Sequence, residues 1–114
     1  GRERMTSKVE VESRICSHRT VIEVTDNGDG SMAVHIDTDC PSVQTYASLV
    51  SKLDPTDYSE WSDSAVWEMA EKAGLSTTCL IPVALVNACW VEAGMMSKRL
   101  AVKEGPICIR FSEQ

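Results

Sequence analysis

A run of turn residues between two β-rich segments restricts the fold of this chain more than any other feature. Residues 19–25 are rich in β-branched side chains, residues 26–30 read Asp-Asn-Gly-Asp-Gly, and apolar side chains alternate with others through residues 32–37. Asn-Gly and Asp-Gly adopt positive φ easily and are typical of tight turns between antiparallel strands. The sequence therefore predicts a β-hairpin in its first third.

Two further segments have the alternation of half-buried strands. In residues 8–15 Val9, Val11 and Ile15 alternate with charged side chains, and residues 106–111 read Pro-Ile-Cys-Ile-Arg-Phe. A period of two residues indicates a strand with one apolar face. We therefore expect a first strand ahead of the hairpin and a closing strand near the end of the chain.

The middle of the chain changes to helical periodicity. Apolar side chains spaced three and four residues apart predict helices over about 41–53, 63–73 and 82–92. Thr38 or Asp39 is suited to cap the first of them. A cap at Ser62 is expected for the second, and the third begins near Pro82, where a missing N–H is tolerated.

These elements define a fold class and a domain plan. The order β-β-β-α-α-α-β indicates an α+β domain, in which an antiparallel sheet of three to four strands carries three helices on one face. The chain has 114 residues, the length of one ordinary domain. We expect a single domain over residues 8–112, and a disordered start or cloning remnant over residues 1–7.

Charge and cysteine content exclude several classes of function. The formal net charge is −6, and a nucleic-acid-binding protein or one that binds an anionic membrane surface needs basic clusters. The longest apolar stretch, residues 79–96, is interrupted by polar residues and is too short for a membrane span of about 20 residues. The five cysteines form no C-x-x-C pair and follow no signal peptide, which favours a reducing cytoplasm.

Three of the cysteines lie at the ends of predicted elements. Cys16 lies between the first two strands, Cys40 at the start of the first helix, and Cys79 just before the third helix. Helix N-termini stabilise thiolates, so we expect a lowered pKa at Cys40 and Cys79. Cys89 and Cys108 fall within predicted elements and are expected to be small core residues.

Convergence of these three thiolates would form a site for Zn²⁺ or an iron–sulfur cluster. His18, two residues after Cys16, is the nearest candidate for a fourth ligand, and Asp39, next to Cys40, is a second. The cysteine spacing is not that of a zinc ribbon, however. A surface histidine and a helix cap therefore remain open as interpretations of His18 and Asp39.

The cysteine contexts resemble those of a family of small, largely uncharacterised proteins from methanogenic archaea and anaerobic bacteria. That family typically reads Cys-Gly-Phe-x-Thr, Ser-Asp-Cys-Pro, His-x-x-Cys-Pro-Val-Pro and Glu-x-Ala-Gly, and the corresponding segments here are 16–20, 38–41, 76–82 and 92–94, the last without the x residue. Ser76 stands at the position of the family's histidine. The resemblance covers about residues 9–111 and implies no established function.

The layout of the cysteines is also similar to that of the iron–sulfur cluster scaffold proteins. In them, three cysteines follow an early strand, begin a helix after a hairpin, and begin a later helix. This resemblance implies a scaffold-like fold and a three-thiolate site for Zn²⁺ or a cluster. It rests on layout, and fold analogy alone does not establish function.

Three functional hypotheses follow. The first is a non-enzymatic cytoplasmic protein that binds zinc or an iron–sulfur cluster through Cys16, Cys40 and Cys79, with His18 or Asp39 as fourth ligand. The second is a protein that carries sulfur or exchanges disulfides through a reactive thiol. The third is an interaction domain without metal, a homodimer or a binder of another protein, with Trp61 in its interface.

Overall fold

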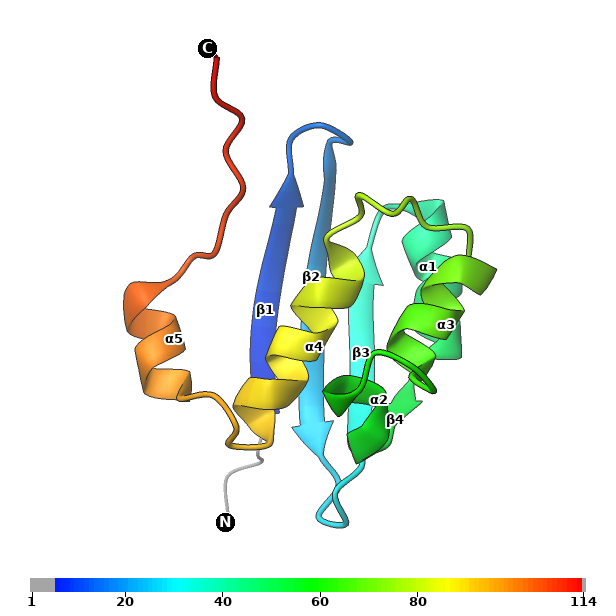
Figure 1. Ribbon diagram of the computed structural model, residues 1–114, viewed down its shortest axis with the longest axis vertical. Helices are drawn as coiled ribbons and strands as arrows, with labels where there is room; N and C mark the ends of the chain where they lie inside the picture. Colours follow the sequence, from blue (N-terminus) through cyan, green and yellow to red (C-terminus); the bar gives the residue numbers. More distant parts are fainter. Residues whose placement is uncertain (1–5, 114) are drawn as a thin grey trace.

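The computed structural model describes residues 6–113, which form one α+β domain built on an antiparallel sheet (Figure 1). Within that range the sheet has four strands in the order β1-β2-β3-β4. They are β1 (Thr6–Ser13), β2 (His18–Asp26), β3 (Met32–Thr38) and β4 (Lys52–Leu53). The predicted fold class is confirmed. Of the predicted start, residues 1–7, five residues lie outside the described range, and Thr6 and Ser7 already belong to β1.

The predicted hairpin is confirmed by the register of β2 and β3. Asp26 pairs with Met32, and the backbone N–H of Asn27 donates to the carbonyl of Ser31 at 3.0 Å. Gly28 and Gly30 have φ of 90° and 93°, values that side chains with a Cβ disfavour. The turn residues therefore form the turn that their conformational preferences predict.

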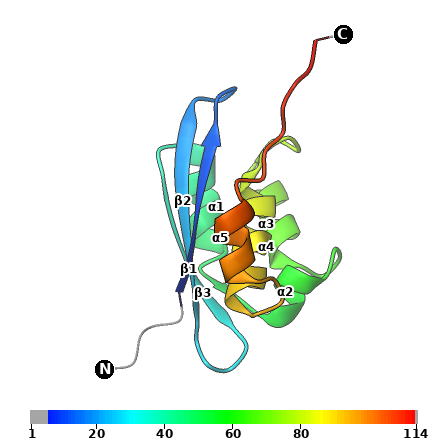
Figure 2. The same ribbon diagram turned by 90° about the vertical axis from the view of Figure 1, so that its left-hand side faces the viewer.

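Five helices lie within the described residues, all on the same side of the sheet; α1 and α4 pack directly against it, and α5 lies against α4 (Figure 2). They are α1 (Pro41–Leu49), α2 (Pro55–Ser59), α3 (Ala65–Lys72), α4 (Ile81–Glu92) and α5 (Lys98–Glu104). The three predicted helices correspond to α1, α3 and α4, although α3 begins after Ser64 and not after Ser62. The short helices α2 and α5 were not predicted.

The predicted first helix is wrong in its last residues. Helix α1 ends at Leu49, and Lys52 and Leu53 form β4, which pairs with Met32 and Ala33 of β3. Leu53 is fully buried there. Its apolar side chain, which extended the helical pattern, is buried by pairing with a strand distant in sequence.

The core lies between the sheet and its helices. Ile22, Val24 and Met32 of the sheet meet Tyr46 of α1 and Leu85 of α4, and all five are essentially inaccessible to solvent. The hydroxyl of Tyr46 donates to the carbonyl of Val66 at 3.0 Å, so this buried polar group is satisfied. No helix of residues 6–113 is both long and apolar enough to cross a membrane.

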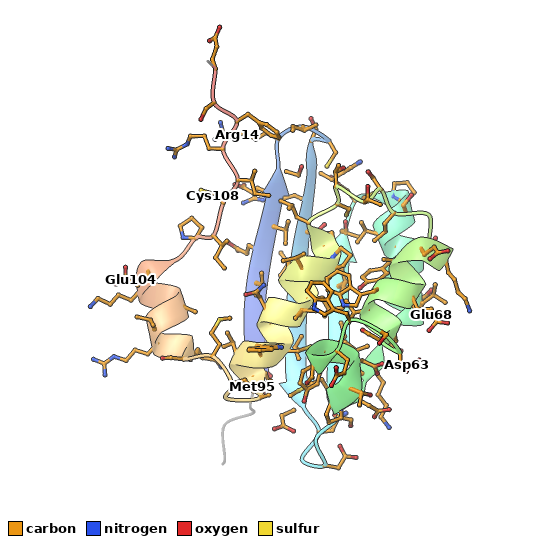
Figure 3. All side chains as sticks on the ribbon, in the orientation of Figure 1. Arg14, Asp63, Glu68, Met95, Glu104 and Cys108 are labelled. Atoms are coloured by element: carbon orange, nitrogen blue, oxygen red, sulfur yellow. The ribbon has the colours of Figure 1, made fainter. Side chains whose placement is uncertain are left out.

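The predicted closing strand over residues 106–111 is wrong. After α5, residues 105–113 extend from the domain without joining the sheet, and Cys108 on this segment is exposed (Figure 3). The alternation of residues 106–111 describes a local preference only. A strand also needs a neighbouring strand to pair with, and this segment has none within the described chain.

Candidate functional site

The three cysteines predicted to form a site lie at one end of the molecule. Cys16 lies in the turn between β1 and β2, Cys40 between β3 and α1, and Cys79 in the loop before α4. In Figure 1 these three connections all lie at the upper end of the sheet, because β1 and β3 end there and α4 begins there. We call Cys16, Cys40 and Cys79 with their connections the thiol end.

The β1–β2 turn presents Cys16 to solvent. The register pairs Ser13 with His18, so residues 14–17 form a four-residue turn, in which Ser17 has φ of 60°. Cys16 is exposed, and its thiol donates a weak hydrogen bond to the Ser13 carbonyl oxygen at 3.9 Å. Hydrogen bonds from the Ser13 side chain and from the His18 backbone N–H to the sulfur lower the pKa of Cys16. This thiol is therefore accessible and more readily ionised than a free cysteine.

Cys40 is the N-cap residue of α1. Its backbone N–H donates to the Thr38 hydroxyl oxygen at 3.2 Å, and Pro41 follows as the first residue of the helix. The predicted capping by Thr38 or Asp39 is wrong, because no side chain caps α1 through a hydrogen bond. Cys40 is partly buried against the edge of the core. Its thiol therefore lies between solvent and the apolar layer.

Cys79 differs from Cys16 in burial and in acidity. It is partly buried, and its backbone N–H donates to the Ser76 carbonyl at 2.9 Å. Burial raises the pKa of Cys79 above the ordinary value, although a hydrogen bond from the Ile81 backbone N–H opposes the rise. The expected lowering of this pKa by the helix N-terminus is therefore wrong, because desolvation of the thiolate outweighs it.

The three thiols are close enough to influence one another. Negative charge on Cys40 and on Cys16 adds to the effect of burial in raising the pKa of Cys79. Like charges disfavour ionisation only over short distances, which agrees with the shared location of the three cysteines. The structure thus brings together thiols that are far apart in the sequence.

His18 and Asp39, the two candidates for a fourth ligand, are bonded to each other. The His18 Nδ1 lies 2.8 Å from the Asp39 Oδ1, and the Arg19 backbone N–H donates to the same oxygen at 3.4 Å. The hydrogen bond from His18 lowers the pKa of Asp39. This pair joins the beginning of β2 to the end of β3. It therefore holds the base of the turn that carries Cys16.

The donor set is suitable for a soft metal ion, whereas its present geometry is not. Thiolates and imidazole are ligands that Zn²⁺ prefers. Across residues 6–113, however, no group of three or more His, Cys, Asp or Glu side chains is arranged so that it could hold a metal ion. The three cysteines thus lie at the same end of the fold, as predicted, but they do not form a preformed set of metal ligands.

The remaining two cysteines do not share one environment. Cys89 on α4 is fully buried, as predicted, and burial raises its pKa to about 12. The prediction that Cys108 is a core residue is wrong, because it lies exposed on the segment after α5. These two thiols lie outside the thiol end and are suitable controls for it.

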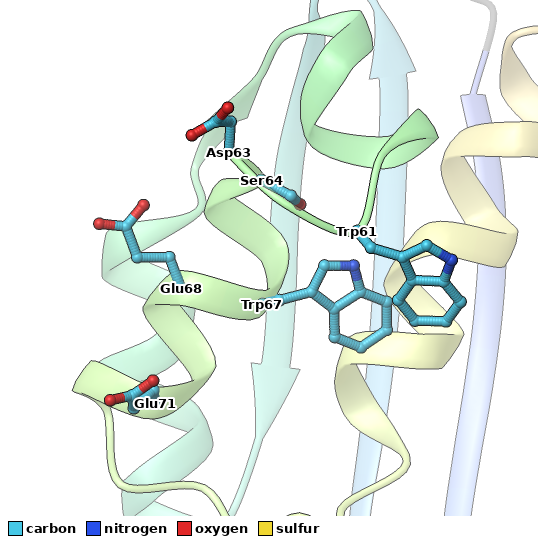
Figure 4. Close-up of a pocket in the computed structure, with 6 residues that line it drawn as sticks. All are labelled: Trp61, Asp63, Ser64, Trp67, Glu68 and Glu71. Carbon is cyan, nitrogen blue, oxygen red and sulfur yellow. The ribbon is translucent and has the colours of Figure 1, made fainter.

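A hollow away from the thiol end was not predicted from the sequence. Trp61 is 84% exposed and stacks on Trp67 at 5.4 Å between ring centroids, beside a hollow of about 400 Å³ at the start of α3. Figure 4 shows that the nearby carboxylates of Asp63, Glu68 and Glu71 point away from the indole pair. The indoles and the carboxylates therefore do not converge on a common ligand position.

Comparison with known proteins gives a family without a function. No curated protein and no solved structure matches the chain. A family of unknown function (DUF6951) matches residues 7–104, which run from the second residue of β1 through α5 and include all three cysteines of the thiol end. The chain therefore belongs to this family of unknown function.

Proposed function

We propose that this protein exchanges disulfides at the thiol end, with Cys16 as the attacking thiol and Cys79 or Cys40 as the resolving thiol. The observation that carries the proposal is that one exposed thiol and two partly buried thiols lie at the same end of the fold. Attack on a disulfide requires an accessible thiolate, and Cys16 has both the exposure and the lowered pKa. Cys79 stays protonated more readily and is shielded.

The reaction has two steps. The Cys16 thiolate attacks one sulfur of a substrate disulfide, the substrate S–S bond breaks, and one half leaves as a thiolate. Cys79 or Cys40 then gives its proton to solvent and attacks the Cys16 sulfur, which releases the second half as a thiolate. The substrate gains two electrons, and the protein is left with one intramolecular disulfide.

The second step requires movement of the β1–β2 turn. All five thiols are free in this structure, so Cys16 has to approach its partner. Residues 14–17 are exposed and are fixed mainly at their base by the register of β1 with β2. The His18–Asp39 pair supports the same base. The tip of the turn is thus held by few contacts with the rest of the fold, whereas its strands are paired.

The pH dependence of alkylation tests the acidity of each thiol. Iodoacetamide labelling at a series of pH values, followed by peptide mapping, gives one midpoint per cysteine. We expect the Cys16 midpoint below, and the Cys79 midpoint above, that of a free cysteine in an unstructured peptide measured alongside, and Cys89 unlabelled in the folded protein. A Cys16 midpoint at or above the free-thiol value would contradict the proposal.

Reaction with glutathione disulfide tests the resolving step. The wild-type protein is expected to form an intramolecular disulfide, whereas removal of the resolving thiol by Cys79→Ser or Cys40→Ser is expected to trap glutathione on Cys16. The matched control is Cys108→Ser, which removes an exposed thiol outside the thiol end and should behave as wild type. Equal trapping on Cys16 and Cys108 in the wild type would overturn the assignment.

Metal binding is the second candidate function, because the same end gathers three thiols and an imidazole. Movement of the β1–β2 turn would have to bring Cys16 to Cys40 and Cys79, with His18 or Asp39 nearby. The similarity in layout to iron–sulfur scaffold proteins favours Zn²⁺ or a cluster as the ligand.

Purification without air or chelator, followed by metal and sulfide analysis, tests this candidate. Near-stoichiometric zinc, or iron with sulfide, that is lost in Cys16→Ser, Cys40→Ser and Cys79→Ser and kept in Cys89→Ser would establish it. A metal-free protein with titratable thiols would leave disulfide exchange as the function to pursue.

A further inference from the structure

The segment after α5 has the side-chain pattern of a strand but lacks a neighbouring strand. Ile107, Ile109 and Phe111 alternate along it and are 83%, 68% and 78% exposed. Such large apolar side chains at every second position are typical of a strand with one buried face. Three of them exposed in succession on one segment are typical of an interaction site.

Strand β1 has a free edge that could accept a further strand. Within the described residues β1 is an edge strand, which pairs with β2 on one side only. The free edge of a strand carries unpaired N–H and C=O groups that accept a further strand. Figures 1 and 2 show that the segment after α5 passes this side of the molecule in the helix layer, without entering the plane of the sheet.

The two surfaces match in charge as well as in backbone pairing. Residues 107, 109 and 111 would continue the helix-side face of the sheet, where Val11 is buried. Arg110 would then lie on the opposite face, where β1 presents Lys8, Glu10 and Glu12 to solvent; Glu12 lies 3.3 Å from Arg19, so Glu10 is the acid best placed to pair with Arg110. Opposite charges on neighbouring strands stabilise their pairing. The charges therefore favour the arrangement in which residues 107, 109 and 111 face the helices and Arg110 faces solvent.

We infer that residues 106–111 of one chain add as a strand to the free edge of β1 in a second copy of the chain. Within one chain residues 106–111 do not pair with β1, although both belong to the same polypeptide. Pairing with a second copy satisfies both surfaces, and reciprocal exchange gives a closed two-fold dimer. This pairing uses the backbone of β1 and of residues 106–111 and none of the thiols of Cys16, Cys40 and Cys79.

Sedimentation velocity of the full chain under reducing conditions tests this inference. The wild type is expected to be a dimer whose dissociation constant rises at least tenfold in Ile109→Asp. The matched control is Val102→Asp, which makes the same kind of change at an exposed apolar residue of α5, outside the segment, and should leave the dimer unchanged. Circular dichroism of each variant confirms that the fold is intact.

Charge reversal tests the orientation of the added strand. Arg110→Glu is expected to weaken the dimer, and a second substitution, Glu10→Arg, is expected to restore part of the affinity. A monomeric wild type, or a dimer unaffected by Ile109→Asp, would overturn the inference. So would a monomer whose thermal stability falls in Ile109→Asp, because that result would place the segment on its own β1.

Discussion

A hydrogen-bonded carboxylate lies at each end of the sheet, and it is buried at one end and exposed at the other. At the hairpin end, which contains Ser7, Asp26 and the last turn of α4, the Glu92 side chain is only 1% exposed. It accepts hydrogen bonds from the Ser7 hydroxyl at 2.7 Å and from the Asp26 backbone N–H at 3.2 Å. At the thiol end the Asp39 side chain, bonded to His18, is 65% exposed.

Burial makes the two carboxylates unequal in their effect on stability. Hydrogen bonds to a buried charge are strong, and their loss leaves donors without partners, whereas an exposed ion pair stabilises a protein little. Lys98 from α5 lies 3.7 Å from Glu92, so this one carboxylate connects β1 and β2 with α4 and α5. Glu92 therefore contributes to stability at the hairpin end, whereas the exposed His18–Asp39 pair at the thiol end contributes little.

The largest expected effect is at Glu92. Glu92→Ala removes the acceptor of Ser7 and Asp26 in a buried site, so we expect the free energy of unfolding in urea to fall by about 2–4 kcal/mol. Glu68→Ala, at an exposed position of α3, should change it by less than about 0.5 kcal/mol. The alkylation rate of Cys16 should stay as in the wild type. If Glu92→Ala lowered the free energy of unfolding as little as Glu68→Ala, the proposed difference in stability between the two ends would be wrong.

A smaller effect is expected from Cys89→Ser. The change places a hydroxyl in a fully buried apolar site of α4, which should lower the free energy of unfolding by about 1–3 kcal/mol. Cys16→Ser and Cys108→Ser replace exposed thiols and should each cost less than about 0.5 kcal/mol. Thermal unfolding followed by circular dichroism measures all three. Equal losses in the three variants would show that the thiol end is as constrained as the core.

The smallest effect is expected from Asp39→Asn, and it depends on pH. The pKa of Asp39 is lowered in the folded protein, chiefly by the hydrogen bond with His18, so its ionised form favours folding. This stabilisation is complete above the unfolded pKa of about 3.9 and is lost as the pH falls through the lower folded pKa.

Unfolding in urea should therefore show a small deficit of Asp39→Asn against wild type near neutral pH, which vanishes in acid. Asp37→Asn, at an exposed position of β3 two residues before Asp39, is the matched control. A deficit that persists unchanged in acid would mean that the carboxylate charge of Asp39 is not what stabilises the turn.

Local patterns predicted those elements whose conformation depends on neighbouring residues. The hairpin follows from the preference of Gly28 and Gly30 for positive φ, and α4 follows from a continuous apolar run that begins with Ile81 and Pro82. Leu53 and residues 106–111 were assigned wrongly by the same reasoning. A helical or alternating pattern in them was real, but pairing with distant strands, or its absence, decided their state.

The candidate site shows the same division. The positions of Cys16, Cys40 and Cys79 at the ends of elements could be predicted from the sequence, and the antiparallel order of the strands then puts them at one end. Their acidities could not. Helix position predicted a lowered pKa at Cys79, but burial raises it. The lowered pKa lies instead at Cys16, where hydrogen bonds in a turn stabilise the thiolate.

The sequence by itself determined the fold class, the hairpin, the three main helices and the placement of three thiols at element ends, because each depends on short-range preferences. The tertiary structure decided which thiol is exposed, that His18 and Asp39 bind each other, that Glu92 is buried, and that residues 106–111 stay unpaired. These depend on burial and on partners far apart in the chain, and such contacts exist only once the sheet and its helices have packed together.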